Sequence, residues 1–243
     1  MTSYFISDLH LESAKPAMTA GFLAFLKQLK PADRLYILGD FFEVWMGDDY
    51  QDALTETVIT ALRQLTEQGS QLFLMHGNRD FLIGDAFCQQ TGAELLPDPC
   101  VIELQGVPVL LMHGDSLCTR DTEYMKLRQM LRNPQWQQQF LSQSLEQRIA
   151  FARQVRSESQ SDQQMKSDDI MDVTAQEVDQ VMSEHQVSWL IHGHTHRPQI
   201  HYWEHQGQPR ERWVLGDWDE QHGWSIDDAS GQCELRRFAF DSL

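Results

Sequence analysis

The stretch TSYFISDLH (Thr2–His10) contains the pattern that decides the fold of this chain. An apolar run that predicts a buried strand ends directly in Asp8 and His10, which an extended chain places on one face. The same pattern occurs again after four later apolar runs, each of which ends in Asp, Asn or His. RLYILG precedes Asp40, QLFLMHG precedes Asn78, VPVLLM precedes His113, and SWLIHG precedes His194 and His196.

Strand-like and helix-like segments alternate in the first half of the chain, which predicts βαβ units and a mostly parallel sheet. In such a sheet, ligands collect at the carboxyl ends of the strands, so we expect these polar side chains to meet at one rim. The strands are expected at Tyr4–Ser7, Leu35–Leu38 and Leu72–Met75, and the helices at Pro16–Leu29 and Asp52–Gln68.

The second half of the chain predicts mainly antiparallel strands. Val101–Leu104 and Val107–Met112 flank Gln105-Gly106, and this pattern is typical of a hairpin. No linker divides the chain, so residues 1–243 are expected to form one domain of the α/β class. Four further strands near the end are expected to form an antiparallel sheet beside the first one, at Gln199–Glu204, Arg212–Leu215, Trp224–Asp227 and Glu234–Phe238.

The stretch from Asp121 to Asp172 (residues 121–172) interrupts this order, because it contains no strand pattern. Basic side chains exceed acidic ones between Asp121 and Lys166, seven against five, although the whole chain has a formal net charge of −17. A helical insertion beside a rim of ligands is a natural lid. Its apolar residues recur at helical spacing, at Trp136, Phe140, Leu141, Leu145 and Ile149.

The composition excludes several classes of function. The net charge of −17 argues against non-specific binding to nucleic acid. No apolar run reaches the length of a membrane span, and Asp8 and His10 interrupt the early apolar stretch, so we expect neither a transmembrane helix nor a signal peptide. The cysteines form no C-x-x-C pair and are expected to be free thiols, at Cys88, Cys100, Cys118 and Cys233.

The seven polar residues at the expected rim are aspartates, an asparagine and histidines, with no cysteine among them. Oxygen and imidazole ligands of this kind suit divalent cations such as Mn²⁺. Seven ligands are too many for one ion, but they fit two ions that share a carboxylate. The sequence therefore predicts two-metal chemistry on a phosphate ester.

The ordered set DLH, GDFFE, GNRD, HGD and GHTH, from Asp8 to His196, resembles the calcineurin-like metallophosphoesterase superfamily. The resemblance implies a four-layer αββα fold with a helical lid insertion. The segments Gly39–Asp49, His76–Gly84, His113–Asp121 and Ile191–Pro198 resemble more closely the branch that acts on UDP-2,3-diacylglucosamine in lipid A biosynthesis. Arg79 follows Asn78 where the wider superfamily usually has histidine, which argues against a general phosphatase.

The resemblance also implies the roles of the residues at the rim. Asp8, His10 and His196 would hold one Mn²⁺, and Asp40 would bridge to a second. A hydroxide between the two ions would attack the α-phosphorus and release UMP and 2,3-diacylglucosamine 1-phosphate. The second ion would be held by Asn78, His113 and His194; the catalytic residues would be Asp40, Asn78, Arg79 and His194; and the substrate would contact Asn78, Arg79, Asp121, Ser159, Gln163, Lys166 and His194.

A substrate with acyl chains predicts an apolar chamber under the lid, formed by the apolar stripe of residues 121–172. The resemblance implies a cytoplasmic protein that associates peripherally with the bacterial inner membrane through this basic lid. No obligate protein partner is expected. Two alternatives remain open: a soluble nucleotide pyrophosphatase or phosphodiesterase of the same superfamily, and a scaffold protein without metals. The lid discriminates against the first, and the filled ligand positions discriminate against the second.

Overall fold

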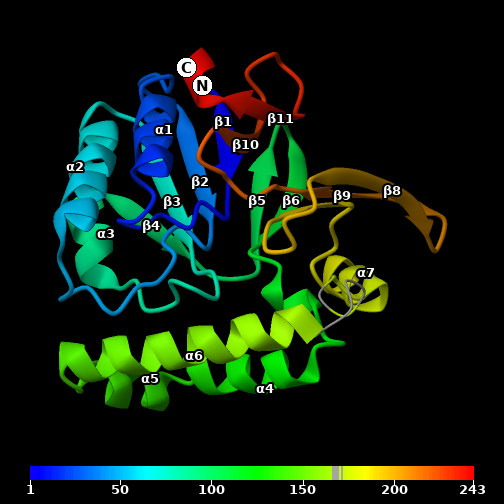
Figure 1. Ribbon diagram of the computed structural model, residues 1–243. Coiled ribbons are helices and arrows are strands. Elements are labelled where there is room, and N and C mark those ends of the chain that lie inside the picture. The colour runs from blue at the N-terminus through cyan, green and yellow to red at the C-terminus, as the bar shows by residue number, and fades with distance from the viewer. Residues whose placement is uncertain (166–169, 171) are drawn as a thin grey trace.

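Two β-sheets lie face to face at the centre of the molecule, and helices cover their outer faces (Figure 1). The structure is a computed structural model that describes residues 1–165, 170 and 172–243. The first sheet has the order β11-β10-β1-β2-β3-β4, and the second has the order β5-β6-β7-β9-β8. The first sheet contains β1 (Ser3–Ile6), β2 (Arg34–Leu38), β3 (Gln71–Met75), β4 (Ala93–Leu96), β10 (His222–Asp227) and β11 (Glu234–Ala239); the second contains β5 (Cys100–Leu104), β6 (Val107–Met112), β7 (Trp189–His192), β8 (Gln199–His205) and β9 (Gln208–Val214).

The first sheet is built from the βαβ units that the sequence predicts. Strands β1, β2, β3 and β4 are parallel, and α1 (Pro16–Leu26), α2 (Ala53–Glu67) and α3 (Asp85–Thr91) cover the outer face. Asp52 caps α2, because its side chain accepts from the backbone N–H of Thr55 while the Thr55 hydroxyl accepts from the Asp52 N–H. Helix α3 and strand β4 were not predicted.

Three apolar clusters separate the layers. The first lies between the helices and the first sheet and includes Phe22 and Leu62, and the second lies between the sheets and includes Phe5 and Leu111. The third joins the outer face of the second sheet to α7 (Ala175–Glu184), where Met182 is fully buried. Helix, sheet, sheet and helix therefore form the four layers of the predicted αββα fold, although α7 itself was not predicted.

The strands after residue 198 do not form a sheet of their own, so that prediction is wrong. Strands β8 and β9 extend the second sheet beside β7, whereas β10 and β11 extend the first sheet beside β1. Phe5 of β1 pairs with Ile226 of β10, and both side chains are fully buried between the sheets. The apolar residues of this segment thus complete the two existing sheets, because each sheet offers an unpaired edge strand.

Helices α4 (Thr122–Leu131), α5 (Pro134–Leu141) and α6 (Leu145–Met165) lie between β6 and β7 in the chain and below the sheets in Figure 1. We call α4–α6 the helical insertion. Within it, the rings of Trp136 and Phe140 stack at 4.9 Å, and Phe151 packs on both. No helix among the described residues is long and apolar enough to cross a membrane.

Hydrogen bonds join the two ends of the stretch that contains the insertion. The Thr119 hydroxyl donates to the Thr174 hydroxyl at 3.0 Å, and the Thr174 backbone N–H donates to the Leu117 carbonyl at 2.8 Å. Strands β6 and β7, which precede and follow this stretch, are neighbouring parallel strands in the second sheet. The chain therefore leaves and re-enters the body of the fold at nearly the same point.

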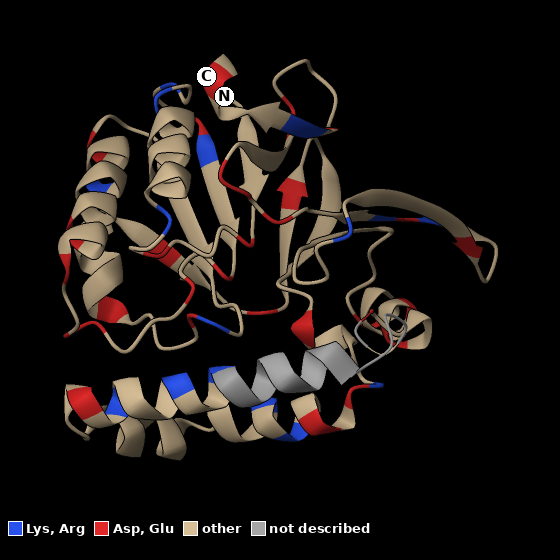
Figure 2. Ribbon diagram, viewed as in Figure 1, with Lys and Arg blue, Asp and Glu red and all other residues tan. Residues whose placement is uncertain are grey.

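Arginines of the insertion contact the loops that follow the strands. Arg128 Nε donates to Asp115 at 2.8 Å, and Arg132 donates to the Gly77 carbonyl at 2.9 Å. Arg148 of α6 is buried and forms an ion pair with Asp49. Figure 2 shows the basic residues distributed along α4 and α6, while acidic residues predominate over the rest of the ribbon.

Candidate metal centre

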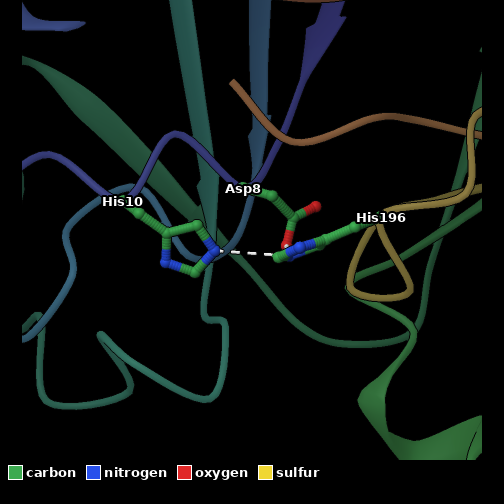
Figure 3. Close-up of side chains that lie close together, drawn as sticks. All are labelled: Asp8, His10 and His196. Carbon is green, nitrogen blue, oxygen red and sulfur yellow. Dashed lines mark hydrogen bonds and ion pairs between the residues drawn. The ribbon is translucent and has the colours of Figure 1, made fainter. Parts of the chain in front are cut away.

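Two groups of potential ligands lie at the carboxyl ends of the strands. Asp8, His10 and His196 form the first group, and the candidate ligand atoms lie within 4.8 Å of one another. Figure 3 shows that the rings of His10 and His196 and the carboxylate of Asp8 converge, although these residues come from loops distant in the sequence. The second group, which meets the same criterion, consists of Asp40, His113 and His194.

In the first group, the two oxygens of Asp8 have different environments. Oδ2 accepts from the Ser7 hydroxyl at 2.5 Å and from the His194 backbone N–H at 2.9 Å. Oδ1 lies 3.4 Å from His196 Nε2, but it is buried and has no hydrogen-bond partner among the described residues. Nε2 of His10 is also 3.4 Å from Nε2 of His196. A buried, unsatisfied carboxylate oxygen beside two convergent imidazole nitrogens is the environment that a divalent cation requires.

In the second group, hydrogen bonds fix the ring of His113. Its Nδ1 lies 2.9 Å from the Leu38 carbonyl oxygen, to which it can only donate, so Nε2 is left to face the site. Nε2 lies 3.0 Å from Asn78 Oδ1, which brings the predicted asparagine ligand to this group. The orientation of His113 is therefore set before any ion binds.

Asp40 lies between the two groups. Its Oδ1 is 3.7 Å from His113 Nε2 and accepts from the Arg79 backbone N–H at 2.8 Å. Its Oδ2 is 3.8 Å from His10 Nε2, in the first group. Each oxygen of one carboxylate thus faces a histidine of a different group, which is the arrangement that a bridging ligand needs.

The backbone at the ligands is strained. Asp8, His10, Asp40, His194 and His196 all have positive φ, between 48° and 68°. L-residues other than glycine rarely adopt this conformation, and each instance costs about 1–2 kcal/mol. Such strain persists only where the surrounding structure imposes it, and it is concentrated at functional sites.

A close backbone approach explains the glycine that precedes Asn78. A Cβ atom on Gly77 would lie 2.1 Å from the backbone nitrogen of Asp40 and 2.1 Å from Asp40 Oδ1. No other residue type would allow the loops after β2 and β3 to approach so closely. The G-N pair in the sequence therefore reflects the packing of two ligand loops against each other.

The ionisable groups of the site influence each other strongly. Burial raises the pKa of an aspartate, but the neighbouring histidines, His196 first, hold the pKa of Asp8 far below its ordinary value. Burial lowers the pKa of a histidine, but Asp40 and Asp115 raise the pKa of His113 to about 9. Burial and the charge of His113 lower the pKa of His194 to about 3. The buried carboxylates thus attract positive charge, as protons here or as cations.

An apolar pocket of about 330 Å³ adjoins the metal groups. Asn78 and Arg79 line it on the side of the body, and α5 and α6 line it on the side of the insertion. Of the five apolar residues expected to form a chamber, Trp136, Phe140 and Ile149 line this pocket. Leu141, which is 40% exposed, and Leu145 are not among its lining residues.

The remaining predicted substrate residues are less well defined. Asp121 is the N-cap of α4, where its carboxylate accepts from the Tyr124 backbone N–H at 3.1 Å. Ser159 and Gln163 lie on α6, but their side chains are outside the described part of the structure, and so is Lys166 entirely. The structure thus brings the seven ligands and Arg79 together and leaves these four substrate contacts as predictions.

Sequence reasoning missed three polar residues beside the ligands. Glu43 is buried, and its Oε2 lies 3.2 Å from His10 Nδ1. Asp115 is also buried and accepts from the Tyr124 hydroxyl at 2.6 Å, while the Tyr124 ring stacks on His194 at 6.0 Å. Glu43 and Asp115 were detectable as acids placed three and two residues after a ligand in otherwise apolar surroundings.

Two groups of potential metal ligands with a carboxylate between them, at the strand ends of an αββα fold, are the arrangement expected of a dinuclear metallohydrolase. The family model for calcineurin-like phosphoesterases matches residues 1–198. The match covers more than half of the chain, and the chain therefore belongs to the calcineurin-like phosphoesterase family. It is a hydrolase.

Three relatives that share one name match nearly the whole chain. A protein of Chromohalobacter salexigens named UDP-2,3-diacylglucosamine hydrolase is 52% identical over 246 residues, which span 100% of this chain and 99% of the relative. A protein of the same name from Pseudomonas paraeruginosa is 56% identical over 235 residues, or 95% of this chain and 97% of the relative. A third, from Marinobacter nauticus, is 54% identical over 225 residues, which span 92% of each chain.

Proposed function

We propose that this chain hydrolyses the pyrophosphate bond of UDP-2,3-diacylglucosamine to UMP and 2,3-diacylglucosamine 1-phosphate. The observation that carries the proposal is the apolar pocket, in which Asn78 and Arg79 lie together with Trp136 and Phe140. A substrate in which a phosphoanhydride is joined to acyl chains needs one site with both a charged part and an apolar part. The relatives that are 52–56% identical and named for this substrate support the proposal. A small polar nucleotide would gain nothing from the apolar part.

We further propose that two Mn²⁺ ions occupy the site, one held by Asp8, His10 and His196, and the other by Asn78, His113 and His194, with Asp40 as the bridging ligand. The orphaned Asp8 Oδ1 and the convergent imidazole nitrogens support this assignment. When bound, such a pair of ions lowers the pKa of a water between them and neutralises charge on the phosphoryl oxygens.

The residues around the ions have separate tasks in this proposal. The Arg79 guanidinium binds the phosphate oxygens of the substrate, because its planar donors match them and it stays charged at every working pH. The Asn78 amide oxygen and the neutral His194 ring are ligands that also border the substrate. Water attacks the α-phosphorus, so the lipid 1-phosphate is the leaving group.

The helical insertion acts as a lid in this proposal, within a single domain of residues 1–243 in which the lid spans 121–172. Asp121, Ser159, Gln163 and Lys166 would contact the substrate from it. Met130 of α4 and Leu141 of α5 are exposed, and α4 and α6 contain basic residues (Figure 2). These features support peripheral contact with an anionic membrane surface, the cytoplasmic face of the inner membrane. No nucleic acid and no obligate protein partner enter the proposal.

Turnover of three substrates tests the proposal. EDTA-treated protein is reloaded with Mn²⁺, and UDP-2,3-diacylglucosamine, UDP-glucose and bis(p-nitrophenyl) phosphate are compared. Each buried methylene contributes about 0.8 kcal/mol, so two or three acyl methylenes in the pocket should favour the lipid substrate by more than about tenfold in kcat/KM. Equal kcat/KM for the lipid and UDP-glucose would contradict the assigned substrate.

Hydrolysis in ¹⁸O-labelled water tests the position of attack. Attack on the α-phosphorus transfers the label to UMP, whereas attack on the β-phosphorus transfers it to the lipid 1-phosphate. Mass spectrometry of both products distinguishes them. Label in the lipid product would contradict the proposed reaction even if the substrate were correct.

A further inference from the structure

Glu43 contacts three residues of the site, yet it is none of the seven ligands. It follows Asp40 by three residues in the loop after β2, and its backbone N–H donates to the Leu11 carbonyl at 3.1 Å, which fixes the loop. Its side chain is only 10% exposed. A buried carboxylate is stable only where positive or donor groups surround it.

The two oxygens of Glu43 face different groups. Oε2 lies 3.2 Å from Nδ1 of His10, a buried nitrogen for which the described residues supply no hydrogen bond of good geometry. Oε1 lies 3.1 Å from the guanidinium of Arg156 on α6 and 3.8 Å from that of Arg79. One carboxylate therefore separates a metal-binding histidine from two permanent positive charges.

We propose that Glu43 is a positioning residue for the first metal group: it holds the His10 ring with Nε2 toward the ion and offsets the charges of Arg79 and Arg156 beside it. This inference rests on the proposed metal ligation and adds a residue to it. It concerns the affinity for the ion, and it does not give Glu43 a contact with the substrate.

The orientation follows from the chemistry of imidazole. A histidine that binds a cation through Nε2 has its proton on Nδ1, and that proton needs an acceptor. Glu43 Oε2 is the acceptor within reach at 3.2 Å. With the acceptor removed, the neutral ring would populate the other tautomer, in which the proton on Nε2 blocks the ion.

The charges of the neighbouring arginines also make cation binding depend on Glu43. Arg79 and Arg156 both lie within 4.0 Å of Glu43 Oε1, and both belong to the wall of the apolar pocket. Without the carboxylate, a divalent cation would bind beside two uncompensated guanidinium groups in a partly desolvated site. Loss of Glu43 therefore weakens cation binding by orientation and by electrostatics together.

The chain offers a matched control. Asp49 is in the same loop and also forms an ion pair with an arginine of α6, Arg148, but it contacts none of the seven ligands in the structure. Asp49→Asn therefore removes an acid and loosens the same helix without altering the surroundings of His10. Glu43→Gln should have an intermediate effect on cation affinity, because its one amide oxygen cannot accept from both His10 and Arg156.

The experiment measures Mn²⁺ binding to the full chain by calorimetry and by metal analysis after dialysis. Outer-shell partners of metal-binding histidines typically alter metal affinity about 10–100-fold, so Glu43→Ala should weaken one of two ions by that factor. Glu43→Gln should show a smaller loss in the same direction, and Asp49→Asn should stay within about threefold of the unaltered chain. Thermal unfolding followed by circular dichroism identifies any variant that does not fold. If Glu43→Ala does not fold, the Mn²⁺ affinity of Glu43→Gln alone tests the inference.

A second measurement reports on the ring itself. Nitrogen NMR of the histidine side chains, with diamagnetic Mg²⁺ or Zn²⁺ in place of Mn²⁺, should detect protonated Nδ1 for His10 in the unaltered chain and a mixture of tautomers in Glu43→Ala. A purely structural role for Glu43 would leave this signature unchanged.

The outcomes separate the inference from the proposed function. Unchanged affinity for both ions in Glu43→Ala and Glu43→Gln would overturn the inference, and so would an equal loss in Asp49→Asn. An unaltered chain that binds fewer than two ions would contradict the proposed metal centre instead, whatever the variants do.

Discussion

The loops that contain the ligands and the helical insertion meet at one site, but they are held in different ways. The ligand loops are largely buried, and backbone hydrogen bonds join them to each other, as from His10 to Asp40 and from Gly193 to His113. The insertion contacts these loops through long side chains such as Arg128 and Arg148. We expect the first arrangement to fix atoms for chemistry and the second to allow adjustment to the proposed substrate. The two regions should therefore respond differently to substitution.

The largest effect is expected at the carboxylate between the two metal groups. Asp40→Ala should lower kcat by on the order of 10³-fold or more, because both ions lose a ligand at once. Metal analysis should find fewer than two ions per chain. If the variant kept its kcat and both ions, the ligand loops would not have the role assigned to them.

A somewhat smaller loss is expected at the most exposed ligand. His196 has a side chain 39% exposed, so His196→Ala should lower kcat by about 10²-fold while the thermal transition stays cooperative. Parallel activity and calorimetry measurements check this separation of chemistry from stability. A variant that unfolded, yet was fully active when kept cold, would show that His196 serves the fold.

In the insertion, the expected effect depends on the substrate. Phe140 is 5% exposed and lines the apolar pocket, so Phe140→Ser should lower kcat/KM for the diacylated substrate by more than about tenfold. Hydrolysis of bis(p-nitrophenyl) phosphate should change little, since Arg79 and the ligands are intact.

Leu141→Ser is the matched control for that experiment. Leu141 is the next residue of α5, but it is 40% exposed and does not line the pocket. Leu141→Ser should leave kcat/KM unchanged for both substrates. Equal losses on both substrates in Phe140→Ser would mean that Phe140 packs the insertion onto the body, and would remove the contrast between the two regions.

The smallest effect concerns stability where the insertion meets the body. The Asp98 side chain is only 8% exposed, it forms an ion pair with Arg128 at 3.9 Å, and burial raises its pKa to about 6. A carboxyl with a raised folded-state pKa stabilises the fold below its unfolded pKa, and this contribution is lost as pH rises through 6. Asp98→Asn should therefore increase the free energy of unfolding at pH 7.5 by on the order of 1–3 kcal/mol, and by less at pH 4.5.

Denaturant unfolding at the two pH values checks this prediction. The exposed substitution Asp241→Asn removes the same charge from an acidic chain and serves as the reference. If Asp98→Asn increased the free energy of unfolding equally at both pH values, the raised pKa of Asp98 would not be the cause. A loss at pH 7.5 would mean that the contact with Arg128 outweighs the cost of burial.

The fold class and the rim were predictable because each ligand directly follows a continuous apolar strand. Asp8 and His113 illustrate this: Asp8 follows a run in which only Tyr4 is partly exposed, and His113 directly follows the buried residues Val109–Met112. Local patterns do not specify which strands become neighbours. One partner of β10 is β1, more than 200 residues away, and nothing in Trp224–Asp227 distinguishes that pairing from a separate sheet.

The contacts of the insertion were harder to predict for a related reason. Helical spacing groups Phe140 with Leu141 and Leu145, but the position of α5 against α6 decides which of them lines the pocket. Glu43 was missed because its role depends on the distance to His10 and to Arg156, a residue 113 positions further along the chain.

The hydrogen bonds between Thr119 and Thr174 give the insertion a topological property. Since the chain leaves and returns at one point, a short turn between these residues could replace everything in between without stretching β6 or β7. Closing a short loop there costs little entropy, because its ends are already together. We therefore expect that the insertion could be exchanged for a different one, which would place a different wall beside the same two groups of potential ligands. Substrate range and hydrolytic chemistry are then separable traits of one polypeptide.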